Sequence, residues 1–436
     1  MTLARTPCSV SANSTSRLAV ALLALLPSLP VSALEQRYEL SLELWGFADE
    51  GAQSQAQSDT SLSLLSNFWH DLNNGSDRFA LSPFVRGDSR DAERSHFDLR
   101  EASWNHLGDG YELRSGICQV FWGVTEGVHL VDIINQTDQV ESLDGEQKLG
   151  QPMINLALEG EQQMLDLFVL TGSRERRFPD ADGRLRLPLV VDEDLASYES
   201  ARENHRLDLA ARWQLNLPAL RLGLSGYSGT AREPELLPVV DYSQLLFSDG
   251  QLSGFAPGYA PVLAPYYPLI NQLGLDLQVT QGDLLWKLEA IQRNGGLENY
   301  QAADAGLEYT QVGVFDSPLD LGWLAEYLYD SRDERASGPF EHDILLGWRL
   351  GFNDAASSSL LTSVIIDRYS GERLFSVEAE RRLSDELLLA LELRVFANGS
   401  PQPQSAVEFL SSADPQNKLR PLLQDDFLRL ELSWFF

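Results

Sequence analysis

Residues 428–436 read LRLELSWFF. Its apolar side chains occupy every second position: Leu428, Leu430, Leu432, Trp434 and Phe436. Arg429 and Glu431 stand between them. Successive side chains of a β-strand point to opposite faces, so this spacing puts the apolar groups on one face and the charges on the other. The stretch therefore predicts a strand with one apolar and one charged face.

The same alternation recurs along the chain, for example in residues 207–215, 273–279 and 387–395. A soluble β-sandwich also alternates, so the pattern alone leaves two architectures open. Two features favour a membrane barrel. The polar positions hold full charges, whereas the apolar positions are rich in Leu, Val and Trp, and the connections alternate between short and long.

Tight turns such as 73–76 and 108–110 alternate with longer connections such as 122–150, 174–204 and 230–268. This alternation is typical of outer-membrane barrels. We expect an all-β fold, a transmembrane antiparallel β-barrel of about 18 strands with 16 as the alternative. The expected strands are 37–47, 59–71, 78–87, 96–107, 111–121, 151–160, 164–173, 205–215, 219–229, 269–280, 284–294, 300–314, 320–330, 342–352, 359–367, 373–383, 386–396 and 426–436.

The bilayer explains why such a sheet must close. Lipid offers no hydrogen-bond partners, so an open sheet edge would leave backbone groups unpaired at a high cost in free energy. Alternation is poor near Glu101 and in residues 359–367. We therefore expect β-bulges or misplaced strand boundaries there.

The amino-terminal residues have the composition of a secretory signal. Residues 18–29 form a twelve-residue apolar run, and residues 31–33 read VSA, the small residues that a signal peptidase recognises. A transmembrane helix needs about 20 apolar residues, so a membrane anchor is the weaker interpretation. We expect residues 1–33 to be a signal peptide and residues 34–436 to be one barrel domain.

The composition excludes several functions. The 64 acidic residues outnumber the 33 basic ones, giving a formal net charge of −31, so nucleic acid is not an expected partner. Two cysteines, Cys8 and Cys118, are too few for a disulfide scaffold or a cysteine-rich metal site. The six histidines lack HxxH or HxH spacing, and no GxSxG motif is present. We expect no cofactor, no metal and no enzymatic activity.

The signal, the strands and the terminal motif together resemble Gram-negative outer-membrane porin-like proteins. Trp434 and Phe436 look like the carboxyl-terminal signal read by the barrel-assembly machinery. Residues 116–123 and 132–138 are similar to a motif of alginate-export-like and related uncharacterised proteobacterial barrels, from which Gln119 and Gln136 depart. The resemblance implies an outer-membrane channel of a Gram-negative bacterium. Its implied partners are membrane lipid, lipopolysaccharide and the assembly machinery, and a homo-oligomer stays open.

Residues 122–150 are the best candidate for a functional segment, because they mix apolar and acidic residues. If the segment folds inward, its apolar groups would lie against the barrel wall and its acids would face the pore. The alternative is an outside lid. The pore-constriction candidates are Asp132, Asn135, Asp138, Glu141 and Asp144.

Charged residues on the polar face of the strands supply candidates for the lumen wall. Rings of charge tune ion selection in channels. The alternative is that these side chains pair with one another, which contributes about 0–1 kcal/mol per solvated pair. The candidates are Arg206, Asp208, Arg212, Asp276, Glu289, Arg349, Glu392, Arg394, Arg429 and Glu431.

These features predict an outer-membrane channel or porin for passive or substrate-selective passage of small polar solutes. Two alternatives stay open. One is an export channel for a polymer or lipid that works with an inner-membrane partner. The other is an outer-membrane enzyme or a structural surface protein.

Overall fold

The computed structural model describes residues 34–397, 404–411 and 415–436, so the predicted signal peptide lies outside the described residues. Within them, 18 antiparallel strands form one sheet. The sheet closes because β1 (Leu34–Phe47) pairs with both β2 (Ser58–Leu72) and β23 (Phe427–Phe435). The predicted all-β antiparallel barrel is confirmed, with 18 strands rather than 16.

Each predicted strand corresponds to a barrel strand, with ends that differ by at most three residues. The tight turns and the period-two pattern define these ends well, because a one-residue shift would turn every side chain to the wrong face. The other barrel strands are β3 (Asp77–Asp88), β4 (Phe97–Gly108), β5 (Tyr111–Cys118), β6 (Gln151–Glu159), β7 (Gln163–Thr171), β9 (Leu207–Leu217), β10 (Leu220–Thr230), β15 (Leu269–Gln281), β16 (Leu284–Gly295), β17 (Tyr300–Gln311), β18 (Asp320–Asp330), β19 (His342–Gly351), β20 (Ser359–Asp367), β21 (Arg373–Arg382) and β22 (Leu387–Ala397).

The bulge expected near Glu101 is confirmed. Ser82 pairs with Glu101 and Pro83 with Leu99, which leaves Arg100 as the extra residue on β4. The expectation for residues 359–367 is wrong, because β20 pairs with β19 and β21 in unbroken register. Its alternation is weak because Leu361 and Ile365 belong to an apolar cluster, so apolar residues do not keep to one face of this strand.

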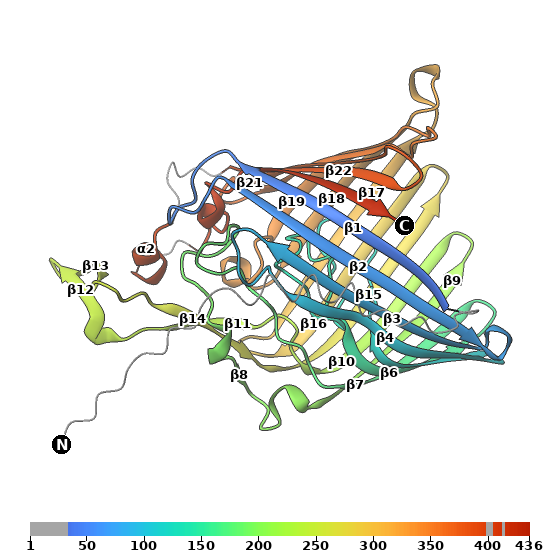
Figure 1. The fold of residues 1–436 in the computed structure, drawn as a ribbon, viewed down its shortest axis with the longest axis horizontal. Coiled ribbons are helices and arrows are strands. Elements are labelled where there is room, and N and C mark those ends of the chain that lie inside the picture. Colours follow the sequence, from blue (N-terminus) through green and yellow to red (C-terminus); the bar gives the residue numbers. More distant parts are fainter. Residues whose placement is uncertain (1–33, 398–403, 412–414) are drawn as a thin grey trace.

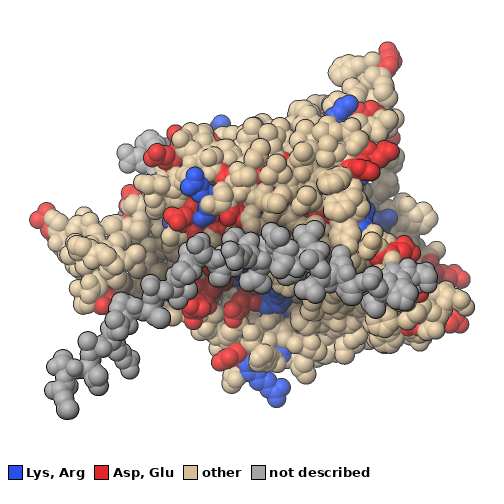
Figure 2. All heavy atoms as spheres, in the orientation of Figure 1, with Lys and Arg blue, Asp and Glu red and all other residues tan. Residues whose placement is uncertain are grey.

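The two faces of the barrel wall differ in polarity. Large apolar side chains such as Leu273, which is 68% exposed, and Trp323 point outward, whereas Asp208 and Glu289 are fully buried inside. Figure 2 shows uncharged side chains over most of the visible wall and charged ones mainly toward its ends. An apolar band on the outside and charges on the inside suit a barrel in lipid.

The two ends of the barrel also differ. Long connections with short elements of their own gather at one end, and the carboxyl terminus lies toward the other (Figure 1). No helix among the described residues is long and apolar enough to cross a membrane. The short elements are η2 (Asn73–Gly75), β8 (Ser197–Tyr198), β11 (Glu235–Val239), β12 (Leu245–Ser248), β13 (Gln251–Phe255), β14 (Val262–Tyr267), α2 (Ala406–Ser411) and the 3₁₀ turns η3 (Glu193–Leu195), η4 (Glu203–His205), η5 (Tyr242–Gln244), η6 (Val314–Asp316), η7 (Asp333–Arg335) and η8 (Arg420–Leu422).

The connection between β7 and β9 reaches across the barrel mouth. Arg184 forms an ion pair of 2.6 Å with Asp425, which precedes β23, and donates hydrogen bonds to the carbonyls of Asp49 and Ala56 between β1 and β2. The same guanidinium lies 4.0 Å from the ring centre of Phe47. This connection therefore covers part of the entrance on the long-loop side.

Candidate functional site: a segment across the lumen

Residues 119–150, here called the lumen segment, connect β5 to β6 through the barrel interior. Its tip contacts β16, β18 and β19 through Glu289, Glu326 and Arg349. Going round the ring, β18 lies eight strands from β5 in one direction and ten in the other. The segment thus reaches almost the opposite wall, and the predicted inward fold is confirmed.

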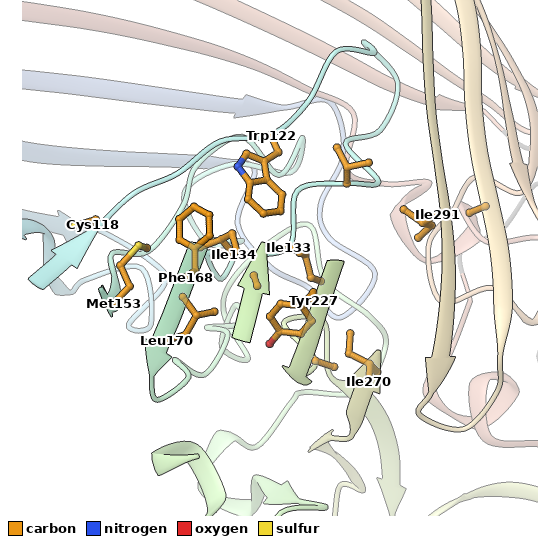
Figure 3. Close-up of a cluster of buried hydrophobic side chains, with 14 of the residues drawn as sticks. Cys118, Trp122, Ile133, Ile134, Met153, Phe168, Leu170, Tyr227, Ile270 and Ile291 are labelled. Atoms are coloured by element: carbon orange, nitrogen blue, oxygen red, sulfur yellow. The ribbon is translucent and has the colours of Figure 1, made fainter. Parts of the chain in front are cut away.

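One side of the lumen segment packs its apolar residues on the wall. Trp122, Ile133 and Ile134 point toward wall residues such as Phe168 and Tyr227 (Figure 3). The segment residues of this cluster are 0–4% exposed. Burying one such side chain contributes about 1.5–3 kcal/mol. Apolar packing therefore holds the segment against the half of the wall formed by β6, β7, β9, β10 and β15–β17.

The tip of the lumen segment is tied to the wall by carboxylates of β16 and β18. The Glu289 carboxylate of β16 accepts hydrogen bonds from the backbone N–H groups of Val124, Thr125 and Val131 at 2.6, 3.2 and 3.1 Å. Because Glu289 is fully buried, these bonds satisfy a charge that water does not reach. They fix the course of the backbone at the tip.

A second wall carboxylate, Glu326 of β18, accepts hydrogen bonds from the N–H groups of Glu126 and Gly127 at 2.9 and 2.8 Å. Gly127 lies so close to the wall that a Cβ there would be 3.0 Å from Leu328 and 3.2 Å from Asp304. A larger residue at this point would need the Leu328 and Asp304 side chains to shift.

Removing both carboxylates is expected to loosen the tip. In a Glu289→Gln/Glu326→Gln variant, amide groups would face N–H donors, and each lost charge-assisted hydrogen bond is worth about 1.5–3 kcal/mol. Hydrogen–deuterium exchange followed by mass spectrometry should show faster exchange of the amides in residues 124–131. Glu392→Gln is the matched control, because this wall carboxylate pairs with Arg394 and Arg429. Equal exchange in both variants would contradict the anchoring role.

Four of the five constriction candidates are buried and hold the segment together. Asn135 accepts the N–H of Val120 and donates to the carbonyls of Cys118 and Leu149, closing the neck of the segment. The other three form ion pairs: Asp132 with Lys148 at 3.0 Å, Asp138 with Arg100 at 2.7 Å and Glu141 with Arg86 at 2.7 Å. The sequence placed these acids at the pore surface, whereas the structure places them in internal contacts.

Asp144 is the exposed member of the five candidates, and Glu146 beside it is exposed as well. Both acids interact electrostatically with Arg394 of β22. Glu146 also lies 3.9 Å from His129, and this interaction lowers the pKa of Glu146. The free face of the segment is therefore acidic and lies near Arg394, which also pairs with Glu378 and Glu392 of the wall.

The wall candidates divide into two groups. Those behind the apolar cluster are buried and paired, as in the ion pair of 2.9 Å between Arg212 and Asp276. Asp208, also buried, lies 3.4 Å from Arg232 and 3.5 Å from Arg206, which precedes β9 rather than lying in it. Together with Glu289, these residues support the segment from behind.

The second group lies on the free side. Arg394 pairs with Glu392 at 2.8 Å and Arg429 pairs with Glu392 at 3.0 Å. Arg349 contacts Glu126 of the segment at 2.9 Å and keeps 43% of its side chain exposed. Glu431 accepts a hydrogen bond from Ser433. These charges remain candidates for the surface that a solute meets.

Sequence reasoning missed several residues that hold or line the site. Glu146 lies inside the predicted segment, so its acidic side chain could have identified it as a further constriction candidate. Glu326 gave no such signal, because its neighbours on the same face of β18, Leu324 and Leu328, are apolar and buried. The wall arginines Arg86 and Arg100 could not be matched to acids 55 and 38 residues further along the chain.

Comparison with known proteins supports this architecture. No family model matches the chain, and no curated protein matches its sequence. The structure is similar to OccK11 (OpdR) of Pseudomonas aeruginosa, with a TM-score of 0.50, 10% identity, and coverage of 92% of this chain and 96% of the other. The chain has the fold of an outer-membrane porin. A BenF-like porin from Pseudomonas fluorescens gives the same TM-score of 0.50, at 8% identity, with 93% of this chain and 99% of the other covered.

The fold comparison bears on the resemblance drawn from the motifs. A porin-type barrel is confirmed as the architecture. The more specific similarity to alginate-export-like barrels stays a prediction.

Proposed function

We propose that the protein is an outer-membrane channel of a Gram-negative bacterium that lets small polar solutes pass. The observation that carries this proposal is the arrangement of the lumen segment. The segment packs its apolar side on one half of the wall and turns its acidic side toward arginines on the other half. Such a division places charged side chains of the segment and of the wall on the same side of the lumen.

Opposite charges across that path would act on a passing solute. Asp144 and Glu146 lie on the segment side, and Arg394 and Arg429 lie on the wall side. Rings and opposed rows of charge in a pore select solutes by charge and orient those with a dipole. Small polar molecules with both charged and uncharged parts fit this arrangement best.

The lumen segment also favours small solutes over a polymer. Asn135 ties its two ends together at the neck, and Glu289 and Glu326 fix its tip to the wall. A polymer in transit would need this doubly anchored segment to leave the lumen. An export channel for a polymer or lipid is therefore the weaker proposal.

Ion selectivity in planar bilayers tests the channel function. Under a salt gradient we expect cation preference, because Asp144 and Glu146 present fixed negative charge on the free face of the segment. Asp144→Asn/Glu146→Gln should shift the reversal potential toward anions. Asp249→Asn/Asp283→Asn is the matched control, because these exposed acids lie in hairpin turns outside the lumen segment. A folded protein that carries no current would refute the channel function.

A further inference from the structure

Three buried side chains meet where the second half of the lumen segment contacts the wall. His96 precedes β4, and Asp138 and Glu141 belong to the segment. Their potential ligand atoms all lie within 4.8 Å of one another, and the three residues are 6%, 0% and 8% exposed. A histidine and two carboxylates this close are a potential ligand set for a cation.

The orientation of His96 shows which of its two ring nitrogens is available to bind a cation. Its Nδ1 lies 3.0 Å from the carbonyl oxygen of Arg94, which can only accept a hydrogen bond, so Nδ1 carries the proton. Nε2 points toward Asp138 and Glu141, 3.7 and 3.8 Å from their oxygens. Among the described residues Nε2 has no hydrogen-bond partner, and the side chain is 1% exposed. A buried nitrogen lone pair thus faces two carboxylates.

The distances suit a metal ion better than hydrogen bonds. Hydrogen bonds require about 2.7–3.2 Å between heavy atoms. Zinc bonds of about 2.0–2.2 Å in tetrahedral geometry hold neighbouring ligand atoms about 3.4 Å apart. The observed 3.7 and 3.8 Å need only a small contraction to reach that value. The Arg94 carbonyl supplies the second hydrogen bond that orients most metal-bound histidines.

The arginines around the three residues do not balance all of the nearby carboxylates, so a cation would be favoured there. Five buried carboxylates, those of Glu43, Asp88, Asp98, Asp138 and Glu141, share ion pairs with four arginines, Arg86, Arg94, Arg100 and Arg174. Glu141 binds Arg86 through both oxygens, yet Oε1, the oxygen nearer to His96, accepts only one of these hydrogen bonds and keeps a second lone pair. Within this set of ion pairs the carboxylates outnumber the arginines by one.

We propose that His96, Asp138 and Glu141 bind a divalent transition-metal ion, with Zn²⁺ as the best match for one imidazole and two carboxylates. A cavity of about 50 Å³ borders Glu141 and Arg94, beside Trp45 and Leu143, and gives an ion a place to approach. The bound ion fastens the segment to the wall at the start of β4. The site lies apart from the acidic face at Asp144.

Zinc titration of the full-length folded barrel tests this site. After treatment with a chelator, isothermal titration with ZnCl₂ should show one equivalent bound per chain. His96→Gln should abolish this binding, whereas His205→Gln should keep it, because His205 is exposed and lies outside the cluster. Heat-modifiable gel mobility confirms that each variant is folded.

Two outcomes overturn the proposal. The first is that wild type takes up no zinc, which would mean that His96 is simply protonated and paired with the carboxylates. The second is that a folded His96→Gln variant binds zinc as wild type does. If His96→Gln does not fold, X-ray absorption at the zinc edge of zinc-loaded wild type identifies the ligands of the bound ion. One imidazole with oxygen ligands supports the site, and two or more imidazoles refute it.

Discussion

Replacing residues 126–146 with a short Gly-Ser linker is expected to raise the single-channel conductance severalfold. The removed residues include the tip that contacts Glu326 and Arg349 and the acidic face that opposes Arg394. The narrowest part of a pore sets most of its electrical resistance, so clearing the lumen should dominate the measurement. Cation preference should fall in the same recordings, because Asp144 and Glu146 are lost.

A matched deletion separates the lumen segment from loops in general. Residues 241–258 contain η5, β12 and β13, which project away from the barrel (Figure 1). Their deletion should leave conductance and selectivity unchanged. If a folded 126–146 deletion conducts as wild type does, the lumen segment is not the constriction.

Deleting Phe436 is expected to reduce the yield of folded barrel in the outer membrane strongly. The ring is 54% exposed on the outer face and lies 5.3 Å from Tyr38 and 4.7 Å from Trp434. Its backbone exchanges two hydrogen bonds with Tyr38, of 2.9 and 3.1 Å, at the seam between β1 and β23. The deletion removes both the terminal aromatic and the last contacts of the strand pair that closes the barrel.

Cell fractionation with protease digestion measures this effect. The deleted chain should appear as a protease-sensitive species without heat-modifiable mobility, whereas Phe436→Tyr should assemble normally. Folding the deleted chain into detergent separates the two causes. Folding in detergent combined with failure in cells would indicate a lost assembly signal, and failure in both would indicate a weak seam. Normal yield in cells would contradict the prediction.

The strand architecture was predictable because it depends on local chemistry. Each barrel strand must present one face to lipid and one to the interior, so stretches such as 207–215 carry the pattern in their own residues. The inward fold of residues 122–150 was predictable for the same reason. Apolar residues such as Ile133 and Ile134 need burial, and a water-exposed loop would not provide it.

The pairing of charges, by contrast, depends on contacts between distant parts of the chain. Glu126 and Glu326 are 200 residues apart, Arg184 and Asp425 are 241 apart, and Arg86 and Glu141 are 55 apart. Period-two alternation assigns a residue to the inner face, but it says nothing about the partner across the lumen. That choice depends on barrel closure and on the path of the segment. For this reason Asp132, Asn135 and Asp138 were predicted at the pore and lie in buried contacts. Sequence periodicity reports the environment of each residue, whereas contacts between distant strands exist only once the sheet has closed.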